Sequence, residues 1–495
     1  MHIFTFIVSM MITLSNIFLG TIMMNTIQTQ LYYADWLKDL KNLLAIPSVR
    51  DDALATIDAP YGPGPKAALD FMMAIAERDG FENIGTVGNR AGFIYVGPEN
   101  DTQPIGVIVH VDVVPVNDLD QWQTDPFTPT VKTDNHLYAR GADDMKSTVM
   151  LTYYAIKAIQ DAKIPLKHQI RFIIGTDEES EWADMHQYFA EEGPLHYGFS
   201  PDGSANLSYG EKGISQLDLY FDSSNNADNP VQLLNFHSGT ATNVLPGFAT
   251  ATVAGIEVDT LQPLYNHYLK TVNLSGNISA VDDFVKLNLQ GVATHAARPE
   301  TGKNAATYLA HFLNNFDFSS NATKFLQFIG QTLHEDPFGE KSGYGKAEPK
   351  LGKTSQNIGI TDFVATKTGH INLNFRYSLA FNEPKTVKQI LQDEPWLSKI
   401  TRDPAGLTPH YVSQDNKLVT LLAQAYQSIT GELPKQGING GASFGRLMPN
   451  GVGFGIIPTS EPSLAHQANE SFNLDNYDTG MHLLIAEILA LADNL

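Results

Sequence analysis

Two glutamates stand side by side in this sequence, directly after an apolar run. Glu178 and Glu179 lie in the stretch GTDEES, residues 175–180, where two like charges repel each other. Neighbouring residues project their side chains in different directions, so one glutamate can bind a metal ion while the other stays free to accept a proton. Such a division of work requires further metal ligands elsewhere in the chain.

His110 and Asp112 form a second candidate pair, in the stretch VIVHVDVVP. They are two residues apart on a predicted strand, which places both side chains on one face near the carboxyl end of that strand. Ligands of open α/β sheets gather at this edge of the sheet. Taken alone, the pair more often indicates a hydrogen-bonded core histidine beside a solvated aspartate, so other residues must decide.

Further carboxylates and a second histidine follow at similar junctions. Asp143 and Asp144 lie in ARGADDMKS, a glycine-led loop that runs into a predicted helix, where acidic residues are also ordinary partners of the helix dipole. Asp202 follows an apolar stretch in FSPDG, and His466 stands in LAHQANE. Together these side chains make a cysteine-free set of hard ligands suited to two divalent ions, with zinc as the expected metal.

The composition excludes several other chemistries. The chain has 495 residues, no Cys and a formal net charge of -22 at pH 7. Without Cys there is no disulfide, no cysteine nucleophile and no thiolate metal site. The negative charge disfavours nucleic acid as a partner, because a phosphate backbone would be repelled.

Residues 1–24 are hydrophobic and lack Asp, Glu, Lys and Arg. Their length approaches the roughly 20 residues that a membrane-spanning helix needs. Against that function, no Lys or Arg precedes Lys38, no small-x-small cleavage site is present, and polar residues interrupt the run. We expect a dispensable extension and a cytoplasmic protein without membrane attachment. The alternative is a protein that is anchored in a membrane, or exported, through this segment.

The pattern of apolar residues predicts an α/β fold interrupted by an insertion. Predicted helices at 67–80 and 147–162 alternate with predicted buried strands at 105–114 and 168–176. Strand-like alternation and polar turns follow after residue 216, and the α/β pattern returns near residue 410. The expected division is an extension at 1–24, a first part of the catalytic domain at 25–213, an inserted domain at 214–409 and a second catalytic part at 410–495.

These motifs, in this order, resemble those of the dizinc metallopeptidase family that includes carnosinases, aminoacylases, glutamate carboxypeptidases and desuccinylases. The resemblance covers almost the whole chain from about residue 30. The stretches APYGPGPKAALDFM, GTDEESEWADMHQYF and GVATHAARPETGKNAA are most similar to the bacterial dipeptidase V group of Xaa-His dipeptidases. The resemblance implies a zinc-exopeptidase-like catalytic domain, with a mixed central sheet flanked by helices, and a large inserted α+β lid domain.

The resemblance also implies a role for each candidate ligand. Two zinc ions would bind per chain, with cobalt or manganese as possible replacements. The bridging ligand would be Asp144, one site would be completed by His110 and Asp202, and the other by Glu179 and His466.

The remaining polar residues of this site would act without binding metal. By resemblance, Glu178 is the general base, and Asp112 hydrogen-bonds the far nitrogen of the metal-binding histidine before it. Asp143 is the alternative candidate for the ligand that bridges the two ions. Counting from the Arg-Gly pair shared with the family assigns this role to Asp144. Relatives also lead us to expect a cis peptide bond between Asp144 and Met145.

The inserted domain carries candidate substrate-binding residues. From strand alternation in HINLNFRYS alone, Arg376 is typical of a solvent-facing position. The resemblance implies instead that Arg376 grips the substrate's terminal carboxylate, and that His295 stabilises negative charge on the scissile carbonyl. Asn243 and the backbone of Gly440 and Gly441 would also contact substrate. The alternatives are a helix-capping His295, and plain turns at the asparagine and the glycines.

The expected activity is hydrolysis of dipeptides with a free amino terminus, by water activated between two zinc ions, with a glutamate general base. The long inserted domain implies a functional monomer, because in the dipeptidase V group an internal duplication of the lid topology lets one chain complete its own site. One alternative is a deacylase or desuccinylase of N-acyl amino acids from the same family. Another is a metal-binding protein without catalytic activity.

Overall fold

The computed structural model describes residues 27–224, 229–404 and 406–495. The expectations for residues 1–24 lie outside this part of the chain. None of the helices within it combines the length and the apolarity that a bilayer crossing demands. The chain divides into two compact units, which we call unit 1 (the described parts of 1–209, 412–437 and 443–495) and unit 2 (the described parts of 210–411 and 438–442).

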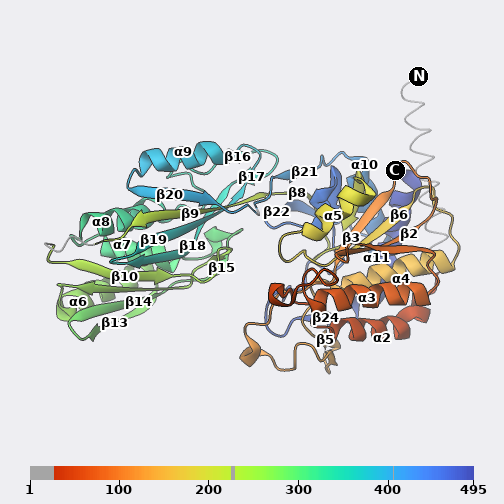
Figure 1. Ribbon diagram of the computed structural model, residues 1–495, viewed down its shortest axis with the longest axis horizontal. Helices are drawn as coiled ribbons and strands as arrows, with labels where there is room; N and C mark the ends of the chain where they lie inside the picture. The colour runs from red at the N-terminus through yellow and green to blue at the C-terminus, as the bar shows by residue number, and fades with distance from the viewer. Residues whose placement is uncertain (1–26, 225–228, 405) are drawn as a thin grey trace, which may run out of the picture. The chain divides into compact units, whose positions relative to one another are not determined.

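A mixed sheet forms the centre of unit 1 (Figure 1). Its strands are β1 (Asn83–Val87), β2 (Ala91–Val96), β3 (Ile105–His110), β6 (Ile170–Gly175), β7 (Tyr197–Ser200), β8 (Asn206–Glu211) and β23 (Asn450–Gly453). They follow the order β1-β2-β6-β3-β7-β23-β8. The neighbours β6, β3, β7 and β23 are parallel, and β1, β2 and β8 join by antiparallel pairing.

Helices flank this sheet, as Figure 1 shows. They are α2 (Tyr33–Leu44), α3 (Pro63–Arg78), α4 (Lys146–Asp161), α5 (Ala183–Glu192), α10 (Lys417–Thr430) and α11 (Asn476–Asn494). Helix α4 contacts β3 and is covered by α2 and α11. Because it is covered on several sides, its residues are buried almost continuously, which fits a sequence that is apolar on most faces.

Three parallel strands of unit 1 end at one edge of the sheet. Strand β3 ends at His110, β6 at Gly175 and β7 at Ser200, and these strands lie side by side in the order β6-β3-β7. The carboxyl ends of parallel strands meet at the same edge. The loops that follow them, with their acidic residues, are therefore brought together although they are far apart in the sequence.

A small sheet joins two of the other loops of unit 1. It consists of β4 (Thr130–Val131), β5 (His136–Tyr138) and β24 (Ser471–Asn473), in the order β24-β5-β4. Strand β5 directly precedes the loop at 139–145, and β24 directly follows the loop at 463–470. Their antiparallel pairing, Tyr138 opposite Ser471, holds these two loops next to each other.

Unit 2 is built on an antiparallel sheet of eight strands. The sheet contains β9 (Gly213–Asp222), β10 (Gln232–Ser238), β12 (Phe248–Ala254), β13 (Ser275–Val281), β14 (Phe284–Gln290), β18 (Ser355–Val364), β19 (Thr368–Tyr377) and β20 (Leu397–Arg402). Their order is β13-β14-β12-β10-β18-β19-β9-β20.

Helices and short strands complete unit 2. The helices are α6 (Val258–Val272), α7 (Ala305–Leu313), α8 (Ser320–Gln327) and α9 (Glu383–Asp393), and the short strands are β11 (Val244–Leu245), β15 (Thr294–His295), β16 (Ala347–Glu348) and β17 (Gly352–Lys353). Two more strands, β21 (His410–Tyr411) and β22 (Lys435–Asn439), pair with β8 and so belong to the mixed sheet, not to the eight-stranded one. The predicted fold class, a mixed sheet with flanking helices plus an inserted α+β domain, is confirmed.

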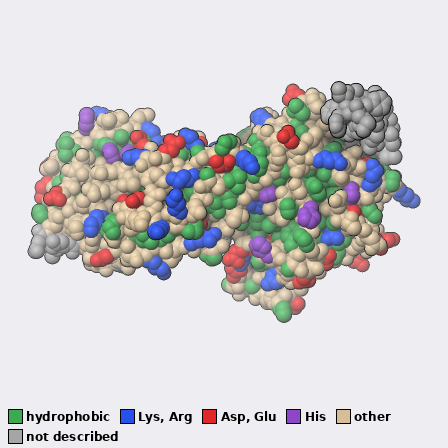
Figure 2. Space-filling model, turned by 90° about the horizontal axis from the view of Figure 1, so that it is seen from above, with side chains coloured by type: hydrophobic (Ala, Val, Ile, Leu, Met, Phe, Trp, Pro, Cys, Tyr) green, Lys and Arg blue, Asp and Glu red, His purple; other side chains and the backbone are tan. Residues whose placement is uncertain are grey.

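Each unit has its own hydrophobic core. On the face seen in Figure 2, basic side chains are scattered among acidic and neutral ones.

Candidate metal centre

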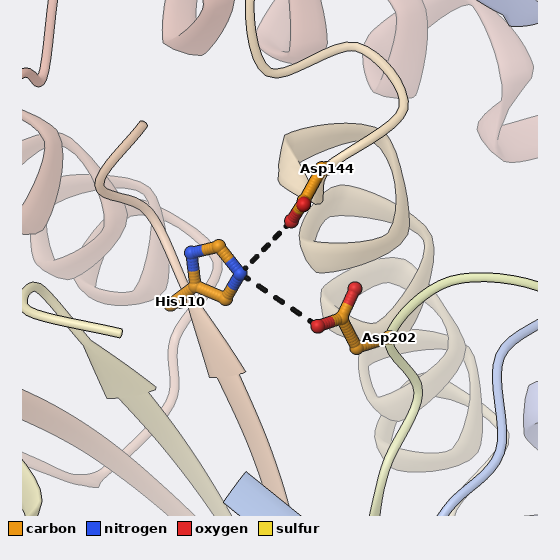
Figure 3. A group of neighbouring side chains, drawn as sticks. All are labelled: His110, Asp144 and Asp202. Carbon is orange, nitrogen blue, oxygen red and sulfur yellow. Dashed lines mark ion pairs between the residues drawn. The ribbon is translucent and has the colours of Figure 1, made fainter. Parts of the chain in front are cut away.

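Three side chains of unit 1, one at the end of strand β3 and two from loops, converge on one point. Nε2 of His110 lies 3.1 Å from Oδ1 of Asp144 and 3.9 Å from Oδ2 of Asp202. Figure 3 shows the imidazole and both carboxylates turned toward one another. One ligand atom from each residue lies within 4.8 Å of the other two, close enough to share a metal ion.

A second group of three uses the same aspartate. Nε2 of His466 lies 3.1 Å from Oδ2 of Asp144 and 3.0 Å from Oε1 of Glu179. The two oxygens of Asp144 therefore face different histidines, Oδ1 toward His110 and Oδ2 toward His466. The structure thus gathers all five predicted ligands into two groups with one shared carboxylate.

The imidazole of His110 is prepared to donate a lone pair. The side chain is 1% exposed, and Nδ1 lies 3.1 Å from the carbonyl oxygen of Asp112, so Nδ1 carries the proton. Among the described residues, Nε2 has no hydrogen-bond partner of good geometry, although the two carboxylates lie in front of it. A buried nitrogen without such a partner, facing carboxylates, fits a metal ligand.

The carboxylate of Asp112 has a different main partner from the one expected. Its Oδ1 lies 3.5 Å from Nδ1 of His110, farther than the carbonyl oxygen of the same residue. The carboxylate accepts hydrogen bonds from the backbone amides of Glu178, at 3.2 Å, and Glu179, at 3.0 Å. Asp112 thereby fixes the backbone of the adjacent glutamates.

Negative charge accumulates around this point. Burial raises the pKa of Asp202 to about 8, and the charge of Asp144 adds to the shift. Burial also raises the pKa of Glu179, and it raises that of Glu178 well above the usual range, with help from the neighbouring carboxylates and against the charge of His110. Divalent cations would relieve this repulsion, so the residues fit a pair of metal ions.

The histidines balance part of the charge. Despite its burial, Asp144 has a pKa below the usual range, because the imidazoles of His110 and His466 lie against its two oxygens. In return, hydrogen bonds to Asp144 and Glu179 raise the pKa of His466 to about 11. The side chain of His466 is 50% exposed, so this edge of the site is open to solvent within unit 1.

The loop after β6 is shaped by one glycine and one buried carboxylate. A Cβ on Gly175 would lie 2.6 Å from Oδ2 of Asp184 and 2.7 Å from the ring of Phe444, so no larger residue fits there. Asp184 is fully buried and accepts the amides of Thr176 and Asp177. Together with Asp112, it holds four successive amides, 176–179.

Asp143 does not face the other ligands, although it neighbours the bridge in sequence. Its Oδ2 accepts hydrogen bonds from Oγ of Ser463 and from the amides of Leu464 and Ala465, at 2.7, 2.8 and 2.9 Å. Asp143 is therefore occupied with the loop that precedes His466. The peptide bond between Asp144 and Met145 is cis, as expected.

Arg376 lies in unit 2 and is buried. It is 6% exposed, its Nε donates to Oδ1 of Asn374 at 3.1 Å, and its Nη1 donates to the carbonyl of Gly440 at 3.4 Å. The prediction of a solvent-facing position, made from alternation alone, is wrong. The polar face of β19 is covered as well as its apolar face, since Asn372 and Asn374 are also buried.

The other predicted substrate contacts lie near one another in unit 2. The carbonyl of Asn243 accepts the amide of Ala296 at 2.8 Å, and Val244 pairs with His295 between β11 and β15. A Cβ on Gly440 would lie 2.7 Å from that of Ala297, so the glycine backbone packs closely against this segment.

His295 is exposed and does not cap the following helix. Its Nδ1 accepts the amide of Ala297 at 3.2 Å, whereas the first turn of α7 is capped by Oδ1 of Asn304, which accepts the amide of Ala306. The amide of Gly441 donates to Oδ1 of Asn439 at 2.9 Å.

The chain is similar in sequence to a family of peptidases and to proteins named as dipeptidases. Residues 106–489 match the family described as Peptidase family M20/M25/M40. The chain is 36% identical over 453 residues to proteins of Staphylococcus haemolyticus (strain JCSC1435) and Staphylococcus aureus (strain MW2), each named "Putative dipeptidase". Each of these matches covers 90% of this chain and 94% of the relative.

Two solved structures share the fold at low sequence identity. Human carnosine dipeptidase 1 aligns with a TM-score of 0.56 and 15% identity, over 96% of this chain and 99% of that one. Aminoacylhistidine dipeptidase from Vibrio alginolyticus aligns with a TM-score of 0.54 and 15% identity, over 93% and 97% of the two chains.

Proposed function

The chain belongs to peptidase family M20/M25/M40, and we propose that it is a dizinc dipeptidase acting on dipeptides with a free amino terminus. The observation that carries this proposal is the shared carboxylate of Asp144, which faces one ligand group on each of its two oxygens. The names of relatives that are 36% identical over nearly the whole chain support a dipeptide as the substrate.

The ligand groups suit two divalent ions. His110, Asp144 and Asp202 would hold one ion, and Glu179 and His466 would join Asp144 in holding the other. Imidazole and carboxylate ligands without thiolates favour zinc and also accept cobalt or manganese. When bound, such ions supply Lewis acidity toward a carbonyl and toward water.

Glu178 would move the proton. Among the described residues, it belongs to neither ligand group, yet its amide is held by Asp112 and its carbonyl accepts Nε1 of Trp182 at 2.7 Å. The carboxylate would accept a proton from the attacking water. As the carbon–nitrogen bond breaks, the same proton would pass to the nitrogen of the leaving amine. A positioned acid-base group of this kind contributes roughly 10²- to 10⁴-fold to the rate.

Residues of unit 2 would bind the rest of the substrate. The guanidinium of Arg376 is suited to the terminal carboxylate, because its planar fork of donors matches two oxygens. His295 would donate to the carbonyl oxygen on which negative charge develops. Asn243 and the amides of Gly440 and Gly441 would orient the peptide.

A dipeptide-panel assay with a base variant tests the proposal. Wild type and Glu178→Ala are compared on unblocked dipeptides and on N-acetyl or N-succinyl amino acids, with metal content measured on the same samples. We expect the wild type to cleave unblocked dipeptides, and Glu178→Ala to keep its metal while turnover collapses. Glu181→Ala is the matched control, since Glu181 is an acidic residue of the same loop with a side chain 66% exposed.

Two outcomes of this assay would contradict the proposal. Wild-type activity confined to the acylated compounds would indicate a deacylase. A metal-containing wild type that releases no amine from any dipeptide would indicate a protein without catalysis.

We further propose that the chain belongs to the Xaa-His dipeptidase group and acts as a cytoplasmic monomer. The described residues of unit 2 form an eight-stranded sheet, and an inserted domain of this size supports a chain that completes its own site. Faster cleavage of dipeptides ending in His than of those ending in Gly would support the group assignment. Light scattering of the purified protein tests the monomer.

A further inference from the structure

Glu470 is a buried carboxylate that follows the predicted ligand His466 by four residues. It is 0% exposed, and both of its oxygens accept hydrogen bonds. Oε1 accepts the backbone amides of Asp143, at 2.9 Å, and Asp144, at 3.0 Å. Oε2 accepts Nη1 of Arg140 at 2.6 Å.

Asp143 connects the same two loops in the opposite direction, from the loop of Asp144 to the loop of His466. Its Oδ2 accepts Oγ of Ser463 and the amides of Leu464 and Ala465, all within 2.9 Å. Each loop therefore sends one carboxylate to the backbone of the other loop. The loop that carries Asp144 is held by Glu470, and the loop that carries His466 is held by Asp143.

Neighbouring groups strengthen the hydrogen bonds that join these two loops. The buried guanidinium of Arg140 balances the charge of Glu470, and its Nη1 also donates to the carbonyl of Gln467 at 3.4 Å. The carbonyl of Glu470 accepts the amide of Ala139 at 3.1 Å, which continues the pairing of β5 with β24. Hydrogen bonds between charged and neutral groups in a buried site are stronger than neutral ones.

The loop at His466 needs such an external hold. His466 has a φ of 66°, in the left-handed region that residues other than glycine rarely adopt. A conformation of this kind persists only where the surrounding structure fixes it. The bonds from Asp143 to Leu464 and Ala465 fix the two residues that precede it.

We propose that Glu470 and Asp143 are positioning residues that set the separation of Asp144 and His466 before a metal ion binds. Neither carboxylate is a ligand; each holds the backbone of a ligand. The ion held by Asp144, Glu179 and His466 then binds a site that is already assembled, so less of its binding free energy is spent on ordering the loops. This inference rests on the proposed metal centre, and it does not depend on the substrate.

Glu470→Gln tests the proposal with little change of volume. Glutamine has one acceptor oxygen, so it cannot serve both the two amides and Arg140. The measurement is a titration of the metal-free protein with Zn²⁺ in competition with a fluorescent chelator. We expect the affinity for one of the two ions to fall roughly 10- to 100-fold, the usual effect of losing a residue that orients a metal ligand.

Glu487→Gln is the matched control. Glu487 is also a fully buried glutamate of unit 1, on α11, and neither of its oxygens has a hydrogen-bond partner among the described residues. This variant should bind Zn²⁺ like wild type. The thermal midpoint of each metal-free variant is recorded as well, because a merely structural role of Glu470 would lower that midpoint and leave the affinity unchanged. That result would overturn the proposal.

A second pair of variants keeps the test decisive if Glu470→Gln does not fold. Asp143→Asn retains an oxygen that can accept the amides of Leu464 and Ala465, so it should keep most of the zinc affinity, whereas Asp143→Ala should lose it. Equal affinities in the two variants would contradict the proposal. The zinc titrations contain no substrate, so they test the positioning role separately from the activity. If Asp143→Asn keeps its zinc affinity, Asp143→Ala loses it, and the protein still has no dipeptidase activity, only the proposed function is refuted.

Discussion

Unit 1 and unit 2 hold their candidate functional side chains in different ways. In unit 1, buried carboxylates reach across to the backbone amides of other loops, as Asp112 does for Glu178 and Glu179. In unit 2, Arg376 lies on the long strand β19 and His295 on the short strand β15, so ladder pairing fixes their backbone. The difference suits different tasks, because metal ligands must meet within a few tenths of an ångström, whereas substrate contacts tolerate adjustment.

The largest effect is expected from the carboxylate that both ligand groups share. Asp144→Ala removes an oxygen ligand from each proposed ion, so both ions should be lost, whereas His466→Ala should lose only one. Metal content per chain, measured by mass spectrometry on the purified proteins, checks this. If Asp144→Ala retained two ions per chain, the convergence seen in unit 1 would not be a metal centre.

His295→Ala should separate catalysis from metal binding. Loss of a donor to the developing negative charge lowers kcat by about 10²- to 10³-fold, while the metal content should stay that of wild type, since His295 belongs to unit 2. Steady-state kinetics on one good dipeptide measure the effect. His237→Ala is the control, because His237 is a half-exposed histidine of the same unit, paired with Asp362. A similar loss in both variants would argue against the proposed role.

Arg376→Lys should act on substrate binding more than on turnover. Lysine keeps the positive charge but loses the planar fork, so KM for dipeptides should rise roughly tenfold with a smaller change in kcat. The comparison with a dipeptide amide, which lacks the terminal carboxylate, makes the test specific. An equal rise in KM for the acid and the amide would show that Arg376 does not bind that carboxylate.

The smallest effect is expected at Glu487, a buried carboxylate of unit 1 that accepts no hydrogen bond from the described residues. Burial raises the pKa of Glu487 well above its usual range, so the folded protein prefers the protonated form. The preference contributes stability below the unfolded pKa near 4.5, and the contribution is lost as the pH rises. At pH 8, Glu487→Gln should therefore raise the thermal midpoint by roughly 2–4 °C, and the gain should vanish near pH 4. A gain that is independent of pH would contradict this explanation.

Much of the site in unit 1 could be predicted because it follows the edge of a parallel sheet. His110 ends β3, whereas Glu179 follows β6 and Asp202 follows β7, and apolar runs with polar ends mark these strands in the sequence. The order of the strands in the sheet, which brings these three residues together, cannot be predicted from the apolar pattern of any single strand. Here the resemblance to a family supplied what periodicity could not, including the distant His466.

Other features could not be predicted, for physical reasons that the structure makes plain. Alternation identifies which residues of β19 share a face, but it does not say whether that face is covered, so Arg376 was placed in solvent by pattern alone. Asp112 was expected to use its carboxylate on His110, yet the turn after β3 brings its carbonyl closer and leaves the carboxylate for two amides. Glu470 gave no signal, since a buried glutamate and an exposed one look alike in a sequence.

Glu178 and Glu179 are consecutive, and one aspartate grips both of their amides. The separation between the group that would carry the proton and the nearest metal ligand is thus a single peptide link, about 3.8 Å from Cα to Cα. Because covalent bonds set this distance, neither a rise in temperature nor substitutions elsewhere in the chain change it. A shift of this loop by one residue would put Glu178 or Ser180 at the position of Glu179, so the length of the segment between β6 and α5 is as consequential as its composition.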